Sequence, residues 1–376
     1  TQRSTRCWEN VMSDRCRYIM VGGFLGAGKT TAIDRLARHL TDSGQRVGLI
    51  CNDQSTGLVD TILLRSKGFS VEEITGGCFC CRFDSLLEAA QKLERASAPD
   101  VFLAEPVGSC TDLVATVSYP LRRIYGERFS VAPLSVLIDP ARSARILGLT
   151  EGRNFSEKVI YVYRKQLEEA DFIVVNKCDA HTPDFLERLV IAIKEAFPHA
   201  QTFVCSSKYS SGLEPWFEAI LSEHGDISRS LEINYDTYAE AEALLGWLNC
   251  TVHLESNQPF DGNRSLVALV DDIRDRVIAE GGNIAHLKVT LDSQDGTGTL
   301  SVVSLVGNDG KPDLRESLLD YVDEGSLIIN LRAEADPAVL EAVTRGALAT
   351  LPGIESSIEH LEQFKPPRPV PTHRMT

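Results

Sequence analysis

The sequence predicts an α/β fold: a mostly parallel sheet covered by helices on both faces, followed by a small α+β domain. Strand-sized apolar runs closed by polar residues alternate with amphipathic helical patterns from residue 17 to about residue 226. A glycine-rich loop joins the first strand to the first helix. After residue 226 this alternation ends, and runs suited to an antiparallel sheet begin. The length of 376 residues also suits two domains.

The first domain is expected at residues 17–226. In chain order its clearest strands read "RYIMVGG", "RVGLICND", "DVFLAEP", "LSVLIDP" and "DFIVVNKCD", and its first helices read "KTTAIDRLARHLTDSG" and "DSLLEAAQKLERA". Strands that are apolar throughout are typical of a parallel sheet buried on both faces. Ligands of such sheets bind at the carboxyl ends of the strands. The candidate functional residues described below all follow a strand in this way.

The second half is expected to comprise an acidic linker at residues 227–245, an α+β domain at 246–356 and a flexible proline-rich tail at 357–376. The strands of the α+β domain read "LNCTVHLES", "IAHLKVTLD", "GTLSVVSLVG" and "SLIINLRA", and its helices read "SLVALVDDIRDRVIAEGG" and "DPAVLEAVTRGALATL". Asp336 should cap the last helix, with Pro337 in its first turn. Residues 1–16 read as an N-terminal extension, and the protein sequence reads naturally from Met12.

Composition argues against several classes of protein. The net charge of −15 disfavours nucleic-acid binding, which needs a basic face. The apolar runs are far shorter than a membrane span, and the first residues lack the apolar core of a signal peptide. Ten cysteines in a chain of this length do not make a disulfide scaffold. We therefore expect a cytoplasmic protein that binds neither membranes nor nucleic acids.

The loop "GFLGAGKT" matches G-x-x-x-x-G-K-[ST] between a strand and a helix, the setting of a phosphate-binding loop. Its glycines let backbone N–H groups surround phosphate oxygens at a helix N-terminus. Lys29 should reach the β- and γ-phosphates, and the Thr30 hydroxyl should bind Mg²⁺. The expected phosphate-binding residues are Gly23, Gly26, Ala27, Gly28, Lys29, Thr30 and Thr31.

Two later strand ends predict which base is bound. Asn176, Lys177 and Asp179 form N-K-x-D, in which the carboxylate can accept both the N1–H and the 2-amino group of guanine. Adenine offers no such pair of donors, so GTP is predicted over ATP. The stem of Lys177 should pack over the base. The next strand end should contact the guanine carbonyl through Ser206, Ser207 and Lys208.

Acidic residues at two further strand ends are candidates for catalysis beside Lys29. Glu105, in "VFLAEPVGS", lies where proteins with this loop place an acid near Mg²⁺ and the attacking water. The backbone N–H of Gly108 could meet the γ-phosphate. Asp53 belongs to "CNDQSTGLVD", a candidate switch loop from Cys51 to Asp60. The alternative for this segment is a solvated acidic loop.

Three cysteines lie within four positions in "GGCFCC": Cys78, Cys80 and Cys81. Cys80 and Cys81 are adjacent and do not readily pair in a disulfide. Cys78 and Cys81 have redox spacing, so metal binding, redox chemistry and plain packing are all open. Metal binding is favoured, because two or three thiolates suit Zn²⁺, Co²⁺ or Cu⁺. Cys110 is expected to be a small packed residue rather than a fourth ligand.

In order, "GGFLGAGKTT", "NDQSTGLVD", "GGCFCC", "EPVG" and "NKCD" resemble the motifs of CobW-type GTPases, a branch of the metallochaperone P-loop class that includes UreG and HypB. The resemblance covers about residues 17–225. It implies a P-loop GTPase fold and a GTPase that passes between GTP and GDP, binds zinc or cobalt and delivers it to a client metalloenzyme. Asp53 and Thr56 stand where the family usually carries two glutamates, which weakens any metal site that uses the second one.

Two other functions stay open. The first is a GTP-dependent accessory chaperone of a metalloenzyme or corrinoid protein, in which the thiols hold only a structural metal. The second is a small-molecule kinase, which would need an arginine-bearing lid; "SYPLRRIYGER" is the only candidate, and N-K-x-D speaks against it. A nucleotide-dependent dimer is also possible.

Overall fold

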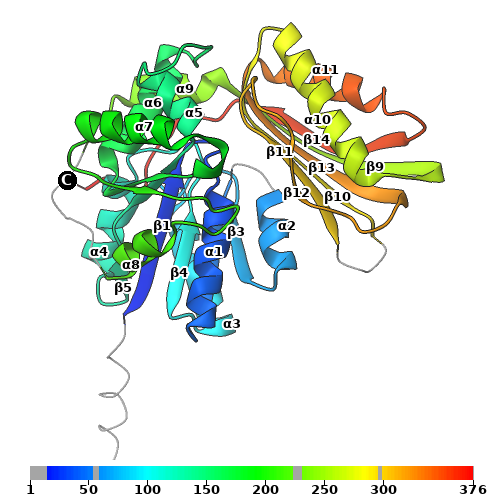
Figure 1. Cartoon of the computed structure of the whole chain (residues 1–376). Coiled ribbons are helices and arrows are strands. Elements are labelled where there is room, and N and C mark those ends of the chain that lie inside the picture. The colour runs from blue at the N-terminus through cyan, green and yellow to red at the C-terminus, as the bar shows by residue number, and fades with distance from the viewer. Residues whose placement is uncertain (1–14, 54–58, 223–230, 295–298, 376) are drawn as a thin grey trace, which may run out of the picture.

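The computed structural model describes residues 15–53, 59–222, 231–294 and 299–375. The residues before Met12 and Thr56 of the candidate switch loop lie outside these ranges. Figure 1 shows two bodies side by side, each built on its own sheet.

The first body confirms the predicted parallel sheet. Its strand order is β3-β2-β4-β1-β6-β7-β8, with β5 also paired to β1, and each of these pairs is parallel. The strands are β1 (Cys16–Gly23), β2 (Val47–Asn52), β3 (Ser70–Ile74), β4 (Val101–Glu105), β5 (Phe129–Val131), β6 (Ser135–Ile138), β7 (Phe172–Val175) and β8 (Gln201–Val204).

Helices cover both faces of this sheet because its strands are apolar on both sides. In β1, Tyr18 and Met20 pack into one apolar core, and Ile19 and Val21 pack into the other. Helices α3 and α6 close the first core, and α1 and α8 close the second. The helices are α1 (Lys29–Asp42), α2 (Val59–Ser66), α3 (Phe83–Ser97), α4 (Tyr119–Tyr125), α5 (Pro140–Ile146), α6 (Glu157–Glu169), α7 (Pro183–Ala196), α8 (Glu214–Ser222) and α9 (Tyr235–Leu244).

The second body is a six-stranded antiparallel sheet in the order β12-β11-β10-β13-β9-β14. Helices α10 (Gly262–Ala279) and α11 (Pro337–Leu348) pack on one face of it. The predicted cap is present, since the side chain of Asp336 accepts a hydrogen bond from the backbone of Ala338. The strands are β9 (Leu245–Phe260), β10 (Asn283–Asp292), β11 (Leu300–Leu305), β12 (Asp313–Glu316), β13 (Val322–Glu334) and β14 (Glu355–Phe364).

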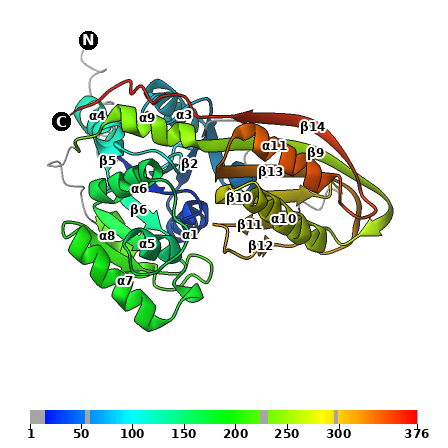
Figure 2. The ribbon, with the colours of Figure 1, turned by 90° about the horizontal axis from the view of Figure 1, so that it is seen from above.

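Two segments differ from the sequence prediction. The expected linker contains helix α9, which packs on α6 through Tyr238 and Ala241 beside Val162. The expected flexible tail begins with strand β14, which pairs with β9. The residues after β14 then return across the first body, and Figure 2 shows this red segment running past α9 and ending near α4. The polar composition of one segment and the proline-rich composition of the other do not indicate a helix or a strand. Each element is stabilised by a partner far away in the sequence, which local patterns do not reveal.

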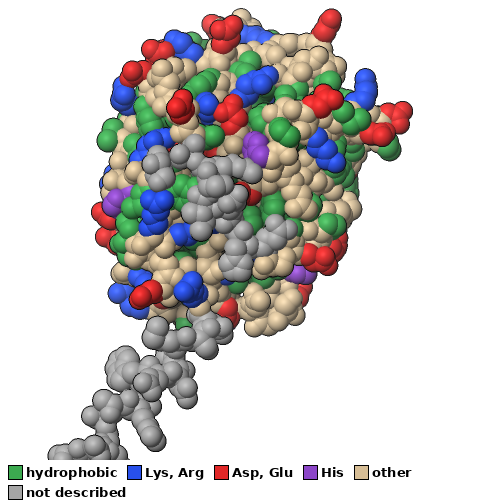
Figure 3. Space-filling model, turned by 90° about the vertical axis from the view of Figure 1, so that its left-hand side faces the viewer, with side chains coloured by type: hydrophobic (Ala, Val, Ile, Leu, Met, Phe, Trp, Pro, Cys, Tyr) green, Lys and Arg blue, Asp and Glu red, His purple; other side chains and the backbone are tan. Residues whose placement is uncertain are grey.

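On one face of the molecule (Figure 3) the charged residues are mixed in sign. On the face drawn in Figure 3, blue and red side chains are interspersed among the described residues rather than gathered into a basic stripe. Among the helices that the structure describes, none is long and apolar enough to cross a membrane.

Candidate functional site

The phosphate loop lies between the end of β1 and the start of α1, against the second body. Gly26 has φ +80°, and a Cβ there would come within 2.6 Å of Val306 Cγ2, which follows β11. Gly28 has φ +92°, and a Cβ there would come within 2.5 Å of Asn176 Nδ2. Both positions need glycine for their backbone conformation as well as for space. The second body therefore sits directly on the loop expected to hold phosphate.

Lys29, Thr30 and Glu105 meet at the floor of a cleft beneath the second body. Lys29 Nζ lies 3.8 Å from Glu105 Oε1, and Thr30 Oγ1 donates a hydrogen bond of 3.2 Å to the same oxygen. Burial raises the pKa of Glu105 to about 7, against the attraction of Lys29. Burial also lowers the pKa of Lys29. The other carboxylate oxygen of Glu105 is buried without a hydrogen-bond partner among the described residues.

The acidic residues of the candidate switch loop face the same cleft. Asp60 pairs with Lys288 of β10, and although burial alone would raise the pKa of Asp60, Lys288 lowers it. Asp53 Oδ1 lies 3.5 Å from an Arg332 nitrogen of β13. Both partners come from the second body. This part of the segment is therefore held by ion pairs in a cleft, which is unlike the solvated acidic loop that the sequence left open.

A second cavity, of about 390 Å³, continues from the cleft past Gly28 and is lined by the expected base-binding residues. Asp179 accepts a hydrogen bond from the Ser206 hydroxyl, so one carboxylate oxygen is oriented by its neighbour. Lys177 has φ +57°, and its ammonium group donates to Gly26 O at 2.7 Å and pairs with Asp139 at 3.0 Å. Lys208 lines the cavity but is paired with Asp313 of the second body at 2.8 Å.

Several predicted binding residues also hold the site together, and three of them, Gly23, Ala27 and Ser206, are not among the residues that line its two cavities. Asn176 is 2% exposed; its amide donates to Ala27 O and its carbonyl accepts from Ser207 N, both at 2.9 Å. Gly23 is paired with Leu137 of β6. The predicted residues that do line the cleft are Gly26, Gly28, Lys29, Thr30, Thr31, Asp53, Glu105, Gly108 and Lys177.

The three cysteines of the thiol motif form a compact cluster between β3 and α3. The Sγ–Sγ distances are 2.7 Å from Cys78 to Cys80, 3.2 Å from Cys78 to Cys81 and 3.5 Å from Cys80 to Cys81. Hydrogen bonds from Cys110, Cys80 and Cys81 lower the pKa of Cys78 well below its usual value, so the cluster favours one thiolate. Three soft donors this close suit one metal ion.

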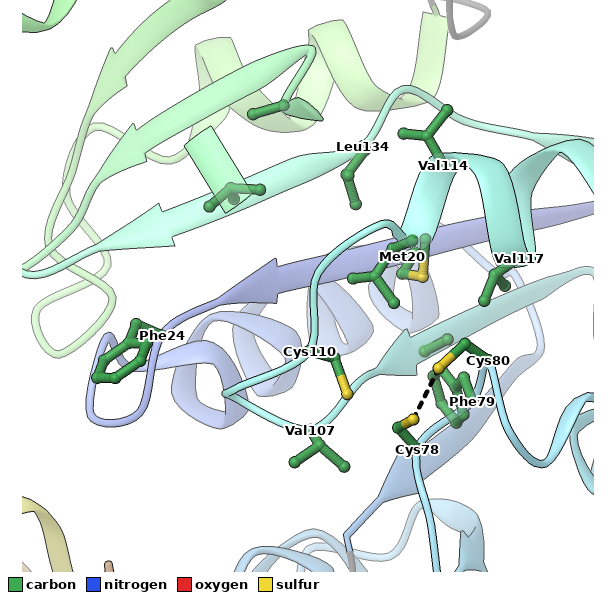
Figure 4. Packing of buried hydrophobic residues seen from close by; sticks show 14 of the residues in the cluster. Met20, Phe24, Cys78, Phe79, Cys80, Val107, Cys110, Val114, Val117 and Leu134 are labelled. Atoms are coloured by element: carbon green, nitrogen blue, oxygen red, sulfur yellow. Dashed lines mark hydrogen bonds between the residues drawn. The ribbon is translucent and has the colours of Figure 1, made fainter. Parts of the chain in front are cut away.

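Cys110 approaches this cluster more closely than the sequence suggested. Figure 4 shows its sulfur pointing toward Cys78 from the loop after β4. Cys78, Cys81 and Cys110 line a cavity of about 250 Å³, together with the buried carboxyl of Glu242 from α9. One oxygen of Glu242 has no hydrogen-bond partner among the described residues, and burial raises the pKa of this group to about 8.

The C-terminal segment closes the outer side of the thiol cluster. Val370 N–H points at Cys81 Sγ at 3.2 Å, and Thr372 N–H donates to Cys80 O at 2.8 Å. Arg374 Nε bonds the buried carboxylate of Asp112 at 2.7 Å. These contacts were not predicted, because nothing in a proline-rich sequence signals its distant partner.

Two segments connect the cleft with the thiol cluster. Asn52, which lines the cleft, donates hydrogen bonds to Ile74 O at 3.0 Å and Gly77 O at 2.7 Å, just before Cys78. Glu105, the last residue of β4, lines the cleft, and Cys110, in the loop that follows, lines the cavity at the cluster only five positions later. A change at the cleft can therefore reach the thiols through one side chain and one short loop.

The second body supplies cleft residues that sequence reasoning missed. They follow a period of two along each strand, but nothing local indicates what that face covers. They are His286, Lys288, Val302, Ser304, Arg315, Asn330 and Arg332.

Part of the chain is similar in sequence to proteins named zinc chaperones. It is 32% identical over 168 residues to the zinc chaperone YeiR of Escherichia coli K12, which covers 44% of this chain and 47% of that protein. It is 30% identical over 182 residues to the zinc chaperone CobW of a Sinorhizobium species, covering 43% of this chain and 50% of that protein. The chain thus spans about half the length of the curated relatives it matches.

Solved structures with similar architecture include HypB from Helicobacter pylori in complex with nickel. It is 19% identical, covers 58% of this chain and 92% of that chain, and has a TM-score of 0.42. Another is the Zn(II)-bound YjiA GTPase from E. coli, 15% identical, covering 89% of this chain and 99% of that chain, with a TM-score of 0.36. The family profile described as "CobW/HypB/UreG, nucleotide-binding domain" matches residues 17–204, half of the chain. The resemblance seen in the motifs is confirmed, and the chain belongs to the CobW/HypB/UreG nucleotide-binding family.

Proposed function

We propose that this protein is a GTP-hydrolysing metallochaperone, which binds a transition metal ion through Cys78, Cys80 and Cys81 and delivers it to a client metalloenzyme. The observation that carries this proposal is the connection between the cleft and the thiol cluster through Asn52 and the loop from Glu105 to Cys110. Family membership and relatives named zinc chaperones support it.

The residues of the cleft suit hydrolysis of a nucleoside triphosphate. Lys29 and the backbone N–H groups of the phosphate loop would hold the β- and γ-phosphates. Glu105 and Asp53 are the acids placed to orient a water molecule toward the γ-phosphorus. Asp179 would accept the N1–H and 2-amino group of guanine, with the residues Ser206, Ser207 and Lys208 beside it, and Lys177 would pack along the base.

A magnesium ion fits the oxygen donors at the floor of the cleft. Thr30 Oγ1 lies 3.2 Å from Glu105 Oε1, and the second oxygen of Glu105 is buried without a partner among the described residues. Hard oxygen ligands of this kind suit Mg²⁺. Thr30 would bind the ion directly, and Glu105 would bind it directly or through water. Bound there, Mg²⁺ would neutralise phosphate charge.

The metal ion is the cargo of this protein. Zn²⁺ or Co²⁺ suits three thiolates, and three protein ligands leave a position open for exchange. The cavity beside the cluster holds about 250 Å³, room for an ion and several waters at about 30 Å³ each. A γ-phosphate that orders the loop after β4 would also order the thiols, so GTP would tighten metal binding relative to GDP.

The test is a pair of Co²⁺ titrations of the reduced protein, one at saturating non-hydrolysable GTP analogue and one at saturating GDP. Thiolate-to-cobalt absorption reports binding. A coupling of about 1–3 kcal/mol corresponds to roughly 5- to 150-fold tighter binding with the analogue, and linkage requires the metal to favour the analogue by the same factor. Lys29→Ala protein, expected to lose phosphate affinity, should show one metal affinity in both titrations.

Equal metal affinity in wild-type protein would refute the nucleotide-gated carrier. That result would favour the accessory chaperone, which would remodel a metalloenzyme or corrinoid protein while its thiols keep a structural metal. The buried position of Cys80, 1% exposed, is the observation that favours this second candidate. Light scattering in the two nucleotide states would show in parallel whether a nucleotide-dependent dimer forms.

A further inference from the structure

The second body turns one face of its sheet to helices α10 and α11 and the other to the nucleotide cleft. Along β10, Leu287, Val289 and Leu291 lie in the helix-packed core, whereas His286 and Lys288 line the cleft. The strands β11 and β13 alternate in the same way. An antiparallel sheet with helices on one face commonly leaves the other face to water. Here that face roofs the cleft.

Lys288 lies at the centre of this roof. It is directly opposite Ser304 of β11 and Asn330 of β13, and all three line the cleft. Asn330 Oδ1 accepts a hydrogen bond of 3.2 Å from Val59 N at the start of α2. The register of the sheet and this contact place Lys288 beside Asp60, where the two side chains pair at 18% and 27% exposure.

Two other cations of the second body, Arg332 and Arg315, line the cleft with partners of their own. Arg332 is 3% exposed, lies 4.1 Å from the centre of the Trp247 ring and donates to Leu248 O at 2.8 Å. Arg315 is bonded to Asp313 at 2.6 Å. Lys288 differs from both arginines, since its ammonium group is a compact charge on a flexible stem, and its carboxylate partner Asp60 lines the same cleft.

Lys288 and Lys29 face the same cleft from opposite walls, because one belongs to β10 and the other to the phosphate loop. Each ammonium group has a carboxylate nearby, Asp60 for Lys288 and Glu105 for Lys29. A triphosphate entering between the walls brings the negative charge that both lysines can bind, and it competes with Asp60 for Lys288.

We propose that Lys288 is a phosphate-binding residue supplied in cis by the second body, which leaves Asp60 and binds a non-bridging oxygen of the γ-phosphate when GTP enters. The inference rests on the proposed GTPase activity. In hydrolysis a water oxygen bonds to the γ-phosphorus, and the bond to the bridging oxygen breaks with its electron pair passing to GDP. One hydrogen of the water stays on the oxygen now bonded to phosphorus, and the other proton also ends on the released phosphate. Lys288 stays protonated and stabilises the charge on the γ-phosphoryl oxygens.

Through Lys288 the second body would distinguish GTP from GDP, because only GTP carries the γ-phosphate that Lys288 binds. With GTP bound, the roof is tied through Lys288 to the γ-phosphate. After phosphate departs, Lys288 returns to Asp60 and the roof is tied to α2. The two nucleotide states would therefore hold different contacts between the two bodies.

The test compares Lys288→Met and Lys288→Arg with wild-type protein, and uses Lys365→Met as the matched control. Lys365 belongs to the same body but pairs with Asp336, which is not among the residues lining the cleft. Affinities for Mg²⁺-GDP and for a non-hydrolysable Mg²⁺-GTP analogue are measured, with single-turnover hydrolysis of GTP.

Lys288→Met should weaken the analogue about 10- to 100-fold, the effect of losing a charged hydrogen bond, and change GDP affinity less than about threefold. Its single-turnover rate should fall about 10²-fold. Lys288→Arg should recover part of both losses, and the control should match wild type. Retained GDP binding shows that each variant is folded.

An unchanged ratio of analogue to GDP affinity in Lys288→Met would overturn the proposal. So would an equal loss of both nucleotides that Lys288→Arg restores, since that result assigns Lys288 only to holding the two bodies together. A wild-type protein that binds both nucleotides without hydrolysing GTP would refute the proposed GTPase activity instead, and the affinity ratio would still decide the role of Lys288.

Discussion

The C-terminal segment contacts the thiol cluster, and we expect that loosening this segment makes Cys81 accessible to reagents. Arg374 is the anchor of that segment, because its Nε bonds Asp112, whose side chain is 2% exposed. Tyr235 donates a second hydrogen bond to the same carboxylate at 2.7 Å. In Arg374→Ala the docked segment has no arginine to pair with the buried Asp112 carboxylate, so the docked state loses this contact. The equilibrium should shift toward the undocked segment.

The size of the shift follows from the contact that is lost. A hydrogen bond to a charged group contributes about 1.5–3 kcal/mol, and the Tyr235 hydroxyl remains as a partner of Asp112. At about 1.4 kcal/mol for each factor of ten, the undocked population should rise roughly 10- to 100-fold. Undocking removes the Val370 N–H that lies 3.2 Å from Cys81 Sγ, so Cys81 becomes accessible in proportion.

The assay is the labelling rate of Cys81 by a disulfide reagent in metal-free protein, with the labelled site identified by mass spectrometry. Arg368→Ala is the matched control on the same segment, because Arg368 pairs with Asp236 while both side chains are more than half exposed. Such a surface pair contributes about 0–1 kcal/mol, so labelling should change little. Equal labelling rates in wild type and Arg374→Ala would show that Arg374 does not control access to Cys81. An equal rise in Arg368→Ala would show that the buried contact with Asp112 is not the cause of the rise.

Three other predictions concern the base, the thiols and pH. Asp179→Asn should shift binding from GTP toward xanthosine triphosphate, whose 2-oxo group an amide can serve; competition binding would show an unchanged preference if the base assignment is wrong. Serine at both Cys80 and Cys81 should abolish tight binding of one Co²⁺ per chain while the circular dichroism spectrum is kept, and undiminished binding would place the metal elsewhere. Burial raises the pKa of Glu169 to about 8 in the folded protein, so the carboxyl favours folding while protonated, and its stabilisation is lost as pH rises from about 4.5 to about 8, by at most about 1.4 kcal/mol per pH unit. Glu169→Gln should therefore flatten the dependence of unfolding free energy on pH in denaturant titrations, and an unchanged slope would contradict this.

Local sequence patterns were enough to predict the architecture and the meeting of the phosphate loop with Glu105. Apolar runs buried on both faces specify a parallel sheet, because its strands must pack against helices above and below. The phosphate loop and the residues Glu105 and Asp179 follow strand ends, and parallel strands bring those ends to one edge. Their spacing in the sequence was therefore enough to predict that they meet.

The sequence could not assign contact residues to structural or binding roles. Asn176 was predicted among the nucleotide-binding residues; it lines the second cavity and also bridges Ala27 and Ser207. Cys110 was expected to be a packed residue and is buried in the first apolar core, and its sulfur also points at Cys78 (Figure 4). Both outcomes depend on where each side chain points and on shifts of a few ångströms in its position, and the spacing of residues along a strand does not determine either.

Residues close together in the chain, or a regular period of apolar residues, were enough to predict the two folding units, the phosphate loop and the cluster of three thiols. What covers the cleft and the thiol cluster became apparent only in the folded chain. Lys288 meets Asp60 across 228 positions, and Val370 meets Cys81 across 289. Alternation along β10 shows that Lys288 lies on the opposite face from the helix-packed residues, but it does not show what that face covers. The surface that this face covers is set by how the two bodies dock, and docking depends on the complementary charge and shape of many residues that are distant in the sequence.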